Sequence, residues 1–322
     1  MAKEVPEFDS LELNADFRLN IVPRTELDDF ETKIETDYKS IREKVSTRLN
    51  QRFAVLGIDI YRYSDYEELE QVLVPRLFDE LYIQTSHMIA QGLTFVFQPH
   101  VDRTNQFPQN RFRDFFIGTG DGGFQIFENP LQAALFLIEF EAIVRLYNTR
   151  HFMSRIFDLI GPITLRYSVT YDGLYHHGSS YFGPAIINNA RILSKDHLNR
   201  LIIDSGTFDW FHKHCLGVEN LASMTLRDVA AIEDFQTYDH KDLTQELNDL
   251  IFYEPEQGQS EGIKFVIVQK LGFLESKRAR IEVYNVSIQA RVRFGHFMQQ
   301  RQLEFTFSVG NMNAQGLISE NA

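Results

Sequence analysis

Val-Leu-Gly-Ile-Asp-Ile at residues 55–60 and Phe-Ile-Gly-Thr-Gly-Asp-Gly-Gly-Phe-Gln-Ile-Phe at residues 116–127 decide how this chain is expected to fold. Each stretch places one carboxylate, Asp59 or Asp121, where an apolar run of β type ends or turns. Two converging carboxylates supply the hard oxygen ligands that a pair of Mg²⁺ ions requires. The two stretches therefore predict a chemical site as well as strands.

Composition limits the class of protein. The chain has 322 residues, of which 43% are hydrophobic and 24% charged, which is typical of a folded protein of one domain with appended segments, or of two domains. Cys215 is the only cysteine, which excludes a disulfide within one chain or a cysteine-based zinc site and suits a reducing cytoplasm. The formal net charge of −13 argues against nucleic acid as a partner but leaves room for a small phosphate site.

The sequence also argues against a membrane partner. The first residues lack a cationic start followed by an apolar run, so no secretory signal is expected. The most apolar stretch, residues 131–146, is interrupted by Glu139 and Glu141 and is too short to span a bilayer. We therefore expect a cytoplasmic protein.

Three regions emerge from the pattern: residues 1–52, 53–240 and 241–322. In the first, an arm precedes apolar residues at helical spacing from Thr25 onward, and a helix packed on its own domain is favoured over a dimerising helix. In the last, three strand-like runs predict a small antiparallel β unit. These runs are Ile263–Leu271, Arg280–Arg293 and Leu303–Val309.

The middle region alternates between strand and helix patterns, which predicts a mixed α/β layer. The expected strands are Phe53–Ile60, Thr94–Gln98, Phe115–Phe127, Ile163–Tyr171 and Arg200–Asp204. The expected helices are Tyr66–Gln91 with a break at Pro75, Pro130–Asn148 and Ala185–Lys195.

A third motif, Tyr-Phe-Gly-Pro-Ala-Ile-Ile-Asn-Asn-Ala-Arg-Ile-Leu at residues 181–193, gives the two acidic stretches a context. Together the three motifs, in this order, resemble those of class III nucleotidyl cyclases over residues 53–240. Each motif alone is weak, because Gly-Asp-Gly is ordinary turn chemistry and Ile-Asp-Ile an ordinary strand end. The resemblance implies an α+β fold with a ferredoxin-like mixed sheet and helices, joined by the N-terminal helix and the C-terminal β unit.

The resemblance also implies a reaction, in which the 3′-hydroxyl of a nucleoside triphosphate attacks its own α-phosphate and expels pyrophosphate. Asp59 and Asp121 would bind two Mg²⁺ or Mn²⁺ ions per site, and the backbone carbonyl of Ile60 would complete one coordination shell. The turn formed by Tyr61, Arg62, Tyr63 and Ser64 would direct N–H groups at the phosphates. The alternative reading is a pair of ordinary strand-end carboxylates.

Arg191 lies eight residues after Gly183, the spacing at which the family places its transition-state arginine. In the family this arginine comes from the other subunit, so the resemblance implies a head-to-tail homodimer with shared sites. The family's asparagine falls on Ile187 here, and Asn188 can replace it only if the helix register shifts. The alternative for Arg191 is a solvated helix arginine.

Two positions that read the purine base in adenylate and guanylate cyclases depart from the family pattern. The lysine four residues before Asp121 is Ile117 here, and the aspartate three residues before Gly183 is Ser180. With the Asp-Ile-Tyr-Arg-Tyr form of residues 59–63, these departures make the chain more similar to the bacterial pyrimidine cyclases of Pycsar antiphage systems, whose cyclic UMP or cyclic CMP activates a separate effector.

Tyr61 or Tyr63 would fill the space of a purine, with core or rim packing as the alternative for both. A tyrosine hydroxyl donates or accepts and so does not choose between pyrimidines. The resemblance alone favours UTP over CTP, ahead of purines or no turnover.

Several features have weaker interpretations. His176 and His177 are expected in a loop rather than at a metal, because adjacent histidines share one ion poorly. Arg227 falls near a phosphate-binding lysine of the relatives but also suits a surface ion pair. The C-terminal β unit resembles small sensor domains with low specificity, and a structural cap that packs on the dimer is an equally good interpretation. A non-catalytic nucleotide sensor is the competing class; Ile187 and the missing purine-reading pair favour it, and the retention of Asp59 and Asp121 argues against it.

Overall fold

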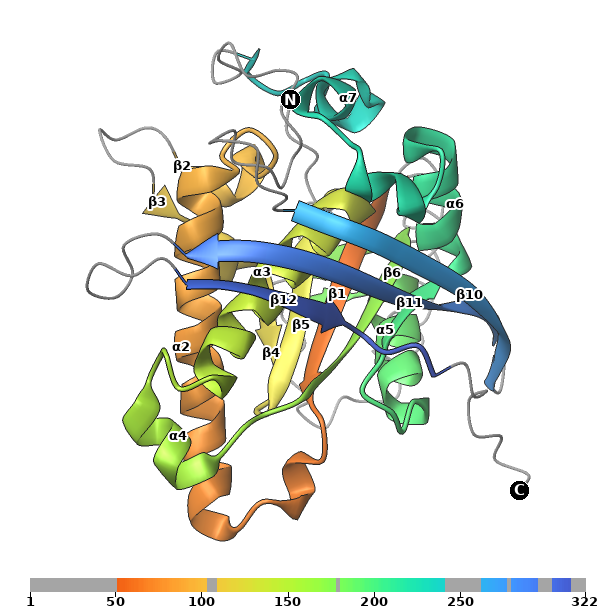
Figure 1. Cartoon of the computed structure of the whole chain (residues 1–322). Coiled ribbons are helices and arrows are strands. Elements are labelled where there is room, and N and C mark those ends of the chain that lie inside the picture. Colours follow the sequence, from red (N-terminus) through yellow and green to blue (C-terminus); the bar gives the residue numbers. More distant parts are fainter. Residues whose placement is uncertain are drawn as a thin grey trace, which may run out of the picture.

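The computed structural model describes six stretches of the chain: residues 51–102, 109–177, 180–240, 262–276, 279–294 and 303–313. Nearly all of the arm and helix expected over residues 1–52 lies outside these stretches. Figure 1 shows helices gathered around a sheet that extends into long C-terminal strands.

Eight strands form the main sheet in the order β10-β11-β9-β6-β1-β5-β4, with β12 also paired to β11. Only the β6–β9 pair of this sheet is parallel within the described stretches. The strands are β1 Arg52–Ile60, β4 Phe116–Gly118, β5 Gly122–Phe127, β6 Leu165–Gly173, β9 Leu201–Asp204, β10 Gly262–Ser276, β11 Ala279–Phe294 and β12 Leu303–Val309. Two small hairpins stand apart, β2 Val101–Asp102 with β3 Gln109–Asn110 and β7 Tyr175–His177 with β8 Ser180–Phe182.

The helices confirm the prediction of a mixed α+β fold. They are α2 Glu68–Gly92, α3 Pro130–Asn148, α4 Ser154–Ile160, α5 Pro184–Lys195, α6 Ser205–Cys215 and α7 Leu226–Ala231. Short 3₁₀ turns join them, namely η1 Tyr63–Asp65, η2 Gln98–His100, η3 Phe112–Phe115, η4 Val218–Ala222 and η5 Glu233–Phe235. No helix in the described part of the chain is long and apolar enough to cross a membrane.

The alternation of side chains along β1 divides the sheet into two faces. Ala54, Leu56, Ile58 and Ile60 point into the large core that contains α2 and α3, which we call the α3 face. Phe53 and Val55 point into a small cluster with Ala185 of α5, which we call the α5 face. Asp59 is separated from Phe53 and Val55 by an even number of residues along the strand, so its side chain belongs to the α5 face.

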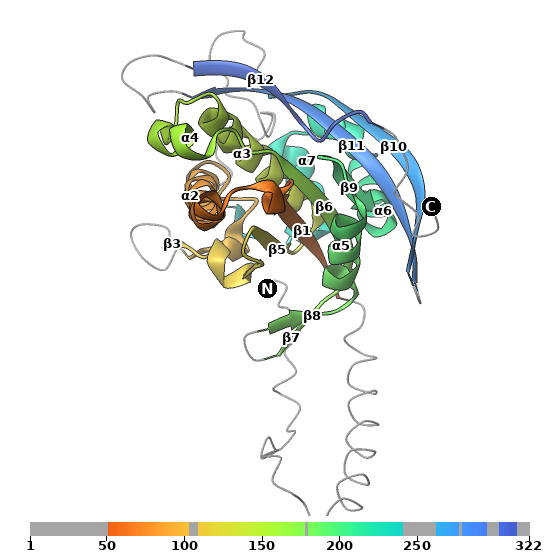
Figure 2. The ribbon, with the colours of Figure 1, turned by 90° about the horizontal axis from the view of Figure 1, so that it is seen from below.

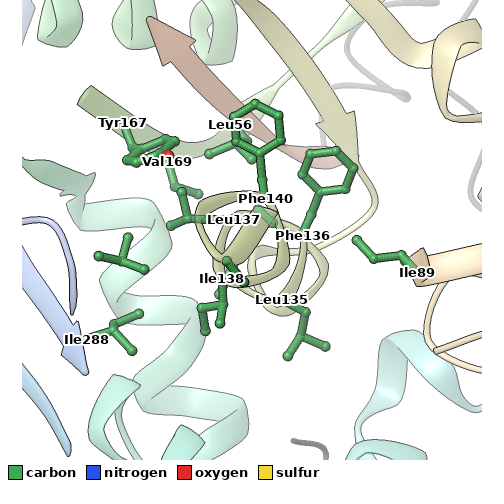
Figure 3. Close-up of a cluster of buried hydrophobic side chains, with 14 of the residues drawn as sticks. Leu56, Ile89, Leu135, Phe136, Leu137, Ile138, Phe140, Tyr167, Val169 and Ile288 are labelled. Atoms are coloured by element: carbon green, nitrogen blue, oxygen red, sulfur yellow. The ribbon is translucent and has the colours of Figure 1, made fainter. Parts of the chain in front are cut away.

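Helix α3 lies at the centre of the core. Figure 3 shows its side chains meeting Leu56 of β1, Tyr167 and Val169 of β6, and Ile288 of β11. Strands therefore cover it from two directions, which explains why nearly the whole helix is buried. The Asn129 side chain accepts a hydrogen bond from the Gln132 N–H at 3.1 Å and caps its first turn.

The C-terminal strands form the expected antiparallel unit, but they also continue the central sheet. Strand β11 pairs with β9 from Val283 opposite Asp204 to Val286 opposite Leu201. Their inner side chains join the core around α3, and Figure 2 shows β10, β11 and β12 curving around the outside of the molecule. The boundary placed after residue 240 stays a prediction.

Two expectations, one for the second helix and one for the segment after it, are wrong. Helix α2 runs through Pro75 without a break. Proline has no N–H to donate to the Gln71 carbonyl four residues earlier, and the hydroxyl of Tyr63 donates to that carbonyl instead, at 2.6 Å. Residues 94–98 form turns and the start of η2 rather than a strand; the Gln132 side chain donates to the Val96 carbonyl at 2.7 Å, so this backbone is satisfied without a neighbouring strand.

Candidate active site

Asp59 stands next to the last residue of β1, between two neighbouring strands. It lies opposite Gly122 of β5 and opposite Arg166 of β6 in the antiparallel ladder. Cross-strand partners on one face have Cβ atoms about 4.5–5.5 Å apart. The sheet therefore brings a guanidinium beside this carboxylate.

The β4–β5 hairpin carries Asp121 to the same place. The Thr119 N–H donates to the Gly122 carbonyl at 3.0 Å, and the Ile60 N–H donates to the Asp121 carbonyl at 3.1 Å. Gly122 cannot be enlarged, because an added Cβ would overlap the backbone carbonyl of Ile58. The glycines of this motif thus let the hairpin approach the end of β1 closely enough to set Asp121 beside Asp59.

The two carboxylates repel each other. Burial raises the pKa of Asp59 above its usual range, the Arg166 guanidinium partly opposes this rise, and the charge of Asp121 adds to it. A divalent cation between the two aspartates would relieve that repulsion. The geometry therefore meets the first requirement of a metal site built on two aspartates.

The donor set fits a hard cation that also binds phosphate. In the described stretches, no three His, Cys, Asp or Glu side chains gather at a possible metal site. Mg²⁺ commonly uses one or two carboxylates and takes its remaining ligands from water and substrate phosphates. Asp59 and Asp121 provide such a pair, and the carbonyl of Ile60 remains a predicted ligand.

Arg166 is the site residue that sequence reasoning missed. Its Nε donates to Asp59 Oδ2, and its Nη1 donates to the backbone carbonyl of Asp196 at 2.5 Å. The guanidinium is thus fixed on two sides. The contact between Arg166 and Asp59 depends on the register of β1 against β6. The only available signal in the sequence was the alternation of apolar and polar residues in 53–60 and 163–171, from which that register could have been aligned.

The turn after β1 is tied to the rest of the chain by its tyrosines. The Tyr61 N–H donates to the Thr164 carbonyl at 2.8 Å, and its hydroxyl donates to the His197 carbonyl at 3.1 Å. Tyr63 bonds the first turn of α2 through the Gln71 carbonyl, and Ser64 is exposed. Both tyrosine hydroxyls have partners within the chain, and their predicted role toward a base stays a prediction.

Asn189, a second missed residue, anchors α5 to the sheet. Its side-chain amide is fully buried and donates to the Val55 carbonyl at 2.7 Å and to the Ser168 carbonyl at 3.1 Å. The Ser168 hydroxyl donates to Asn189 Oδ1 in return. An added Cβ at Gly57 would overlap this oxygen, so the glycine of the first motif admits the helix.

This anchor sets the direction of Arg191. Two residues along a helix correspond to a rotation of about 200°, so Arg191 leaves α5 on the side away from Asn189 and the sheet. Asn188 shares that outward side, and Arg191 Nη1 donates to its Oδ1 at 3.4 Å. Ile187 is 47% exposed. The outward side of α5 thus carries the two residues predicted to act in catalysis.

The remaining predicted residues are spread more widely. Ile117 is half-buried in β4 and packs in the small cluster of the α5 face, while Ser180 is exposed at the start of β8. Arg227 is exposed on α7. The expectation of a loop at His176 is wrong, because this residue lies in β7, where its ring centroid is 4.7 Å from that of Tyr181 across the hairpin.

No family model and no curated protein matches the chain. Solved structures that resemble it include the adenylyl cyclase CyaB from P. aeruginosa, at 11% identity and a TM-score of 0.39 over 73% of this chain and 93% of the other. An adenylate/guanylate cyclase/hydrolase from Silicibacter pomeroyi has 15% identity and a TM-score of 0.36 over 73% and 95%. The guanylate cyclase domain of RhGC from Catenaria anguillulae, in complex with GTP, has 10% identity and a TM-score of 0.39 over 73% and 96%. Likenesses this distant assign no activity.

Proposed function

We propose that this chain is a metal-dependent nucleotidyl cyclase that converts UTP to 3′,5′-cyclic UMP and pyrophosphate. The observation that carries the proposal is the placement of Asp121 beside Asp59, where the charge of Asp121 adds to the raised pKa of the Asp59 carboxyl. In the described part of the chain, no group of three or more acidic, histidine or cysteine side chains is placed to hold a metal, so the proposal rests on this pair. The motif order that resembles class III cyclases supplies the reaction.

The residues divide the work of such a reaction. Asp59 and Asp121 hold the cation-binding end of the site, next to the turn that begins at Tyr61. Mg²⁺ or Mn²⁺ ions bound there would activate the 3′-hydroxyl and neutralise the phosphates. Arg191 presents a planar fork of donors to the charge that grows on the α-phosphate. Asn188 lies beside Arg191 and orients it through their contact.

The direction of Arg191 supports a homodimer with shared sites. Asn189 is turned toward the sheet that holds Asp59, so Arg191 is turned away from it. A second copy of this chain, packed head to tail, would receive that arginine. Mixing Asp59→Ala and Arg191→Ala chains should then restore one complete site per heterodimer, whereas separate sites would give no recovery.

Pyrimidine selectivity rests on the residues that replace a purine-reading pair. Ile117 packs among apolar side chains and Ser180 is exposed, so neither position carries a charge for a purine edge. UTP is favoured over CTP only by the resemblance to Pycsar cyclases. The proposed antiphage role, with a separate effector that reads the cyclic nucleotide, rests on the same resemblance.

One assay separates these alternatives. The full chain is incubated with Mn²⁺ or Mg²⁺ and each of the four nucleoside triphosphates, and pyrophosphate and cyclic product are measured. We expect release chiefly from UTP. Fastest turnover of CTP, ATP or GTP would overturn the base assignment and leave the cyclase assignment intact. Tight binding of one nucleotide without turnover would instead support a sensor, the reading that Ile187 favours.

A further inference from the structure

The loop at residues 196–200, between α5 and β9, bonds two side chains that border the acidic pair. Its Asp196 carbonyl accepts from Arg166 Nη1 at 2.5 Å, and its His197 carbonyl accepts from the Tyr61 hydroxyl at 3.1 Å. Arg166 and Tyr61 each lie on a strand or turn that borders Asp59. The loop thus supports two side chains at the edge of the site.

The same loop is held from its other side by residues after β12. The Asp196 carboxylate binds Arg200 at 2.6 Å, with 3% and 1% of the two side chains exposed. Arg200 Nη1 donates to the Asn313 carbonyl at 3.2 Å, and the Asn311 side chain donates to the Asn199 carbonyl at 2.8 Å. A chain of hydrogen bonds therefore runs from residues 311–313 through the loop to Arg166.

Arg166 changes what Asp59 can offer a cation. A carboxylate has two oxygens, and Arg166 Nε occupies Oδ2. The two side chains are only 22% and 17% exposed, so water screens their interaction weakly. The guanidinium cannot lose its proton in a protein, so this positive charge is permanent.

We propose that Arg166 is a positioning residue that occupies Oδ2 of Asp59, leaves Oδ1 for a divalent cation and is held in place by residues 311–313 through the 196–200 loop. The inference rests on the proposed function for the identity of the cation-binding pair. Its physical consequence is that the fixed charge weakens cation binding to the free protein. The negative charges of a triphosphate offset it, so the nucleotide and the cation bind together.

Mn²⁺ binding to the full chain without nucleotide tests this, with free Mn²⁺ measured by electron paramagnetic resonance. Arg166→Ala should tighten Mn²⁺ binding by about tenfold, because a charge close to the ion is removed. Arg166→Lys, which keeps the charge, should return the affinity toward that of the wild type. Arg111→Ala, which removes an arginine from an exposed pair with Asp114, is the charge-matched control and should change affinity by less than about twofold.

A double variant identifies the carboxylate through which Arg166 acts. In an Asp59→Ala background, Arg166→Ala should no longer tighten binding. Unchanged or weaker Mn²⁺ binding in Arg166→Ala, an equal gain in both backgrounds, or no binding by any variant would overturn the inference. If no nucleotide turns over but the gain in Mn²⁺ affinity depends on Asp59, the proposed function fails and the inference about Arg166 stands. If a nucleotide turns over but Arg166→Ala leaves Mn²⁺ affinity unchanged, the proposed function stands and the inference fails.

The connection to the C-terminal residues has its own test. Asn311→Ala removes the Asn311 side-chain bonds to Asn199, one of the two links to the 196–200 loop, and should tighten Mn²⁺ binding by about two- to threefold, in the direction of Arg166→Ala. Met312→Ala is the matched control, since this side chain is 64% exposed in the same segment. Equal affinities for the two variants would overturn the link through the loop.

Discussion

The two faces of the central sheet are built on different principles. The α3 face buries a continuous apolar core that reaches from α2 to β12, whereas the α5 face has a small apolar cluster and then a run of polar side chains. Along β1 and β6 this run contains Asp59, Arg166, Ser168 and Thr170. Strand alternation alone sends these two sets of residues to opposite sides. The apolar core and the candidate site thus lie on separate faces of the same strands.

The largest expected effect concerns the chemistry of the α5 face. Asp59→Asn removes the carboxylate proposed to bind a cation while keeping its shape, and turnover should fall on the order of 10³-fold, since an electrostatic contact of the transition state is lost. The free energy of unfolding should change by at most about 1–2 kcal/mol, because a repelling charge and an ion pair are lost together. Pyrophosphate release and urea unfolding measure the two quantities.

Arg111→Ala is again the control, since it breaks an exposed ion pair and should leave both values near those of the wild type. Retained turnover in Asp59→Asn would contradict the separation of the faces. It would also remove the main support for the cyclase proposal.

The reverse behaviour is expected on the α3 face. Leu137→Ala empties space in the middle of α3, where the side chain is fully buried, and should lower the free energy of unfolding by about 2–5 kcal/mol. Turnover per folded molecule should not change. Leu159→Ala is the matched control, because that leucine is 61% exposed on α4 and should cost less than about 0.5 kcal/mol. A loss of turnover in folded Leu137→Ala protein would mean that the two faces are coupled.

Asn189 gives the sharpest test of the contrast between the two faces, because it is buried and also positions α5. Asn189→Ala leaves the Val55 and Ser168 carbonyls without their donor and should cost about 1–3 kcal/mol. It should also lower turnover about tenfold, because Arg191 shares the helix. Asn148→Ala is the matched control: it removes an amide that bonds both the N–H and the carbonyl of Ile163.

The Asn148 control should lose stability by a similar amount and keep its turnover. Urea unfolding and pyrophosphate release on the same preparations distinguish the cases. If Asn189→Ala behaves like Asn148→Ala, the helix does not depend on that amide for its catalytic position.

The contrast between the faces also explains which features the sequence predicted. Alternation and glycine spacing identified β1, the β4–β5 hairpin and both aspartates, because strand ends and tight turns are local features. Arg166 and Asn189 were missed because their roles depend on partners 107 and 134 residues away, Asp59 and the Val55 carbonyl. A sequence without register information contains no sign of either contact.

The same distinction accounts for the two errors near α2. The break expected at Pro75 and the strand expected at residues 94–98 came from local rules that are usually sound. At Pro75 the hydroxyl of Tyr63, which lies outside the helix, replaces the missing donor. At residues 94–98 the Gln132 side chain donates to the Val96 carbonyl at 2.7 Å, so buried turns are satisfied without a neighbouring strand.

The smallest expected effect is a pH dependence that arises on the α3 face. Glu139 lies on α3, and burial raises the pKa of its carboxyl from 4.5 to about 7. Between those values the folded chain keeps a proton that the unfolded chain releases, so this group lowers stability as pH rises from about 4.5 to about 7 and adds no slope above that. Because the side chain is partly exposed, the total should be about 1–2 kcal/mol rather than the full value for such a shift.

Glu139→Gln should remove this part of the pH dependence, so its advantage in unfolding free energy over the wild type grows from about pH 4.5 to about pH 7 and then levels off. Urea unfolding at several pH values measures it, with exposed Glu219→Gln as the control that should leave the profile unchanged. The variant should not alter nucleotide turnover, since Glu139 belongs to the core helix. A Glu139→Gln profile parallel to that of the wild type would mean that this carboxyl is solvated. A charge on the core helix would then cost little stability, and the contrast between the two faces would be weaker than their burial indicates.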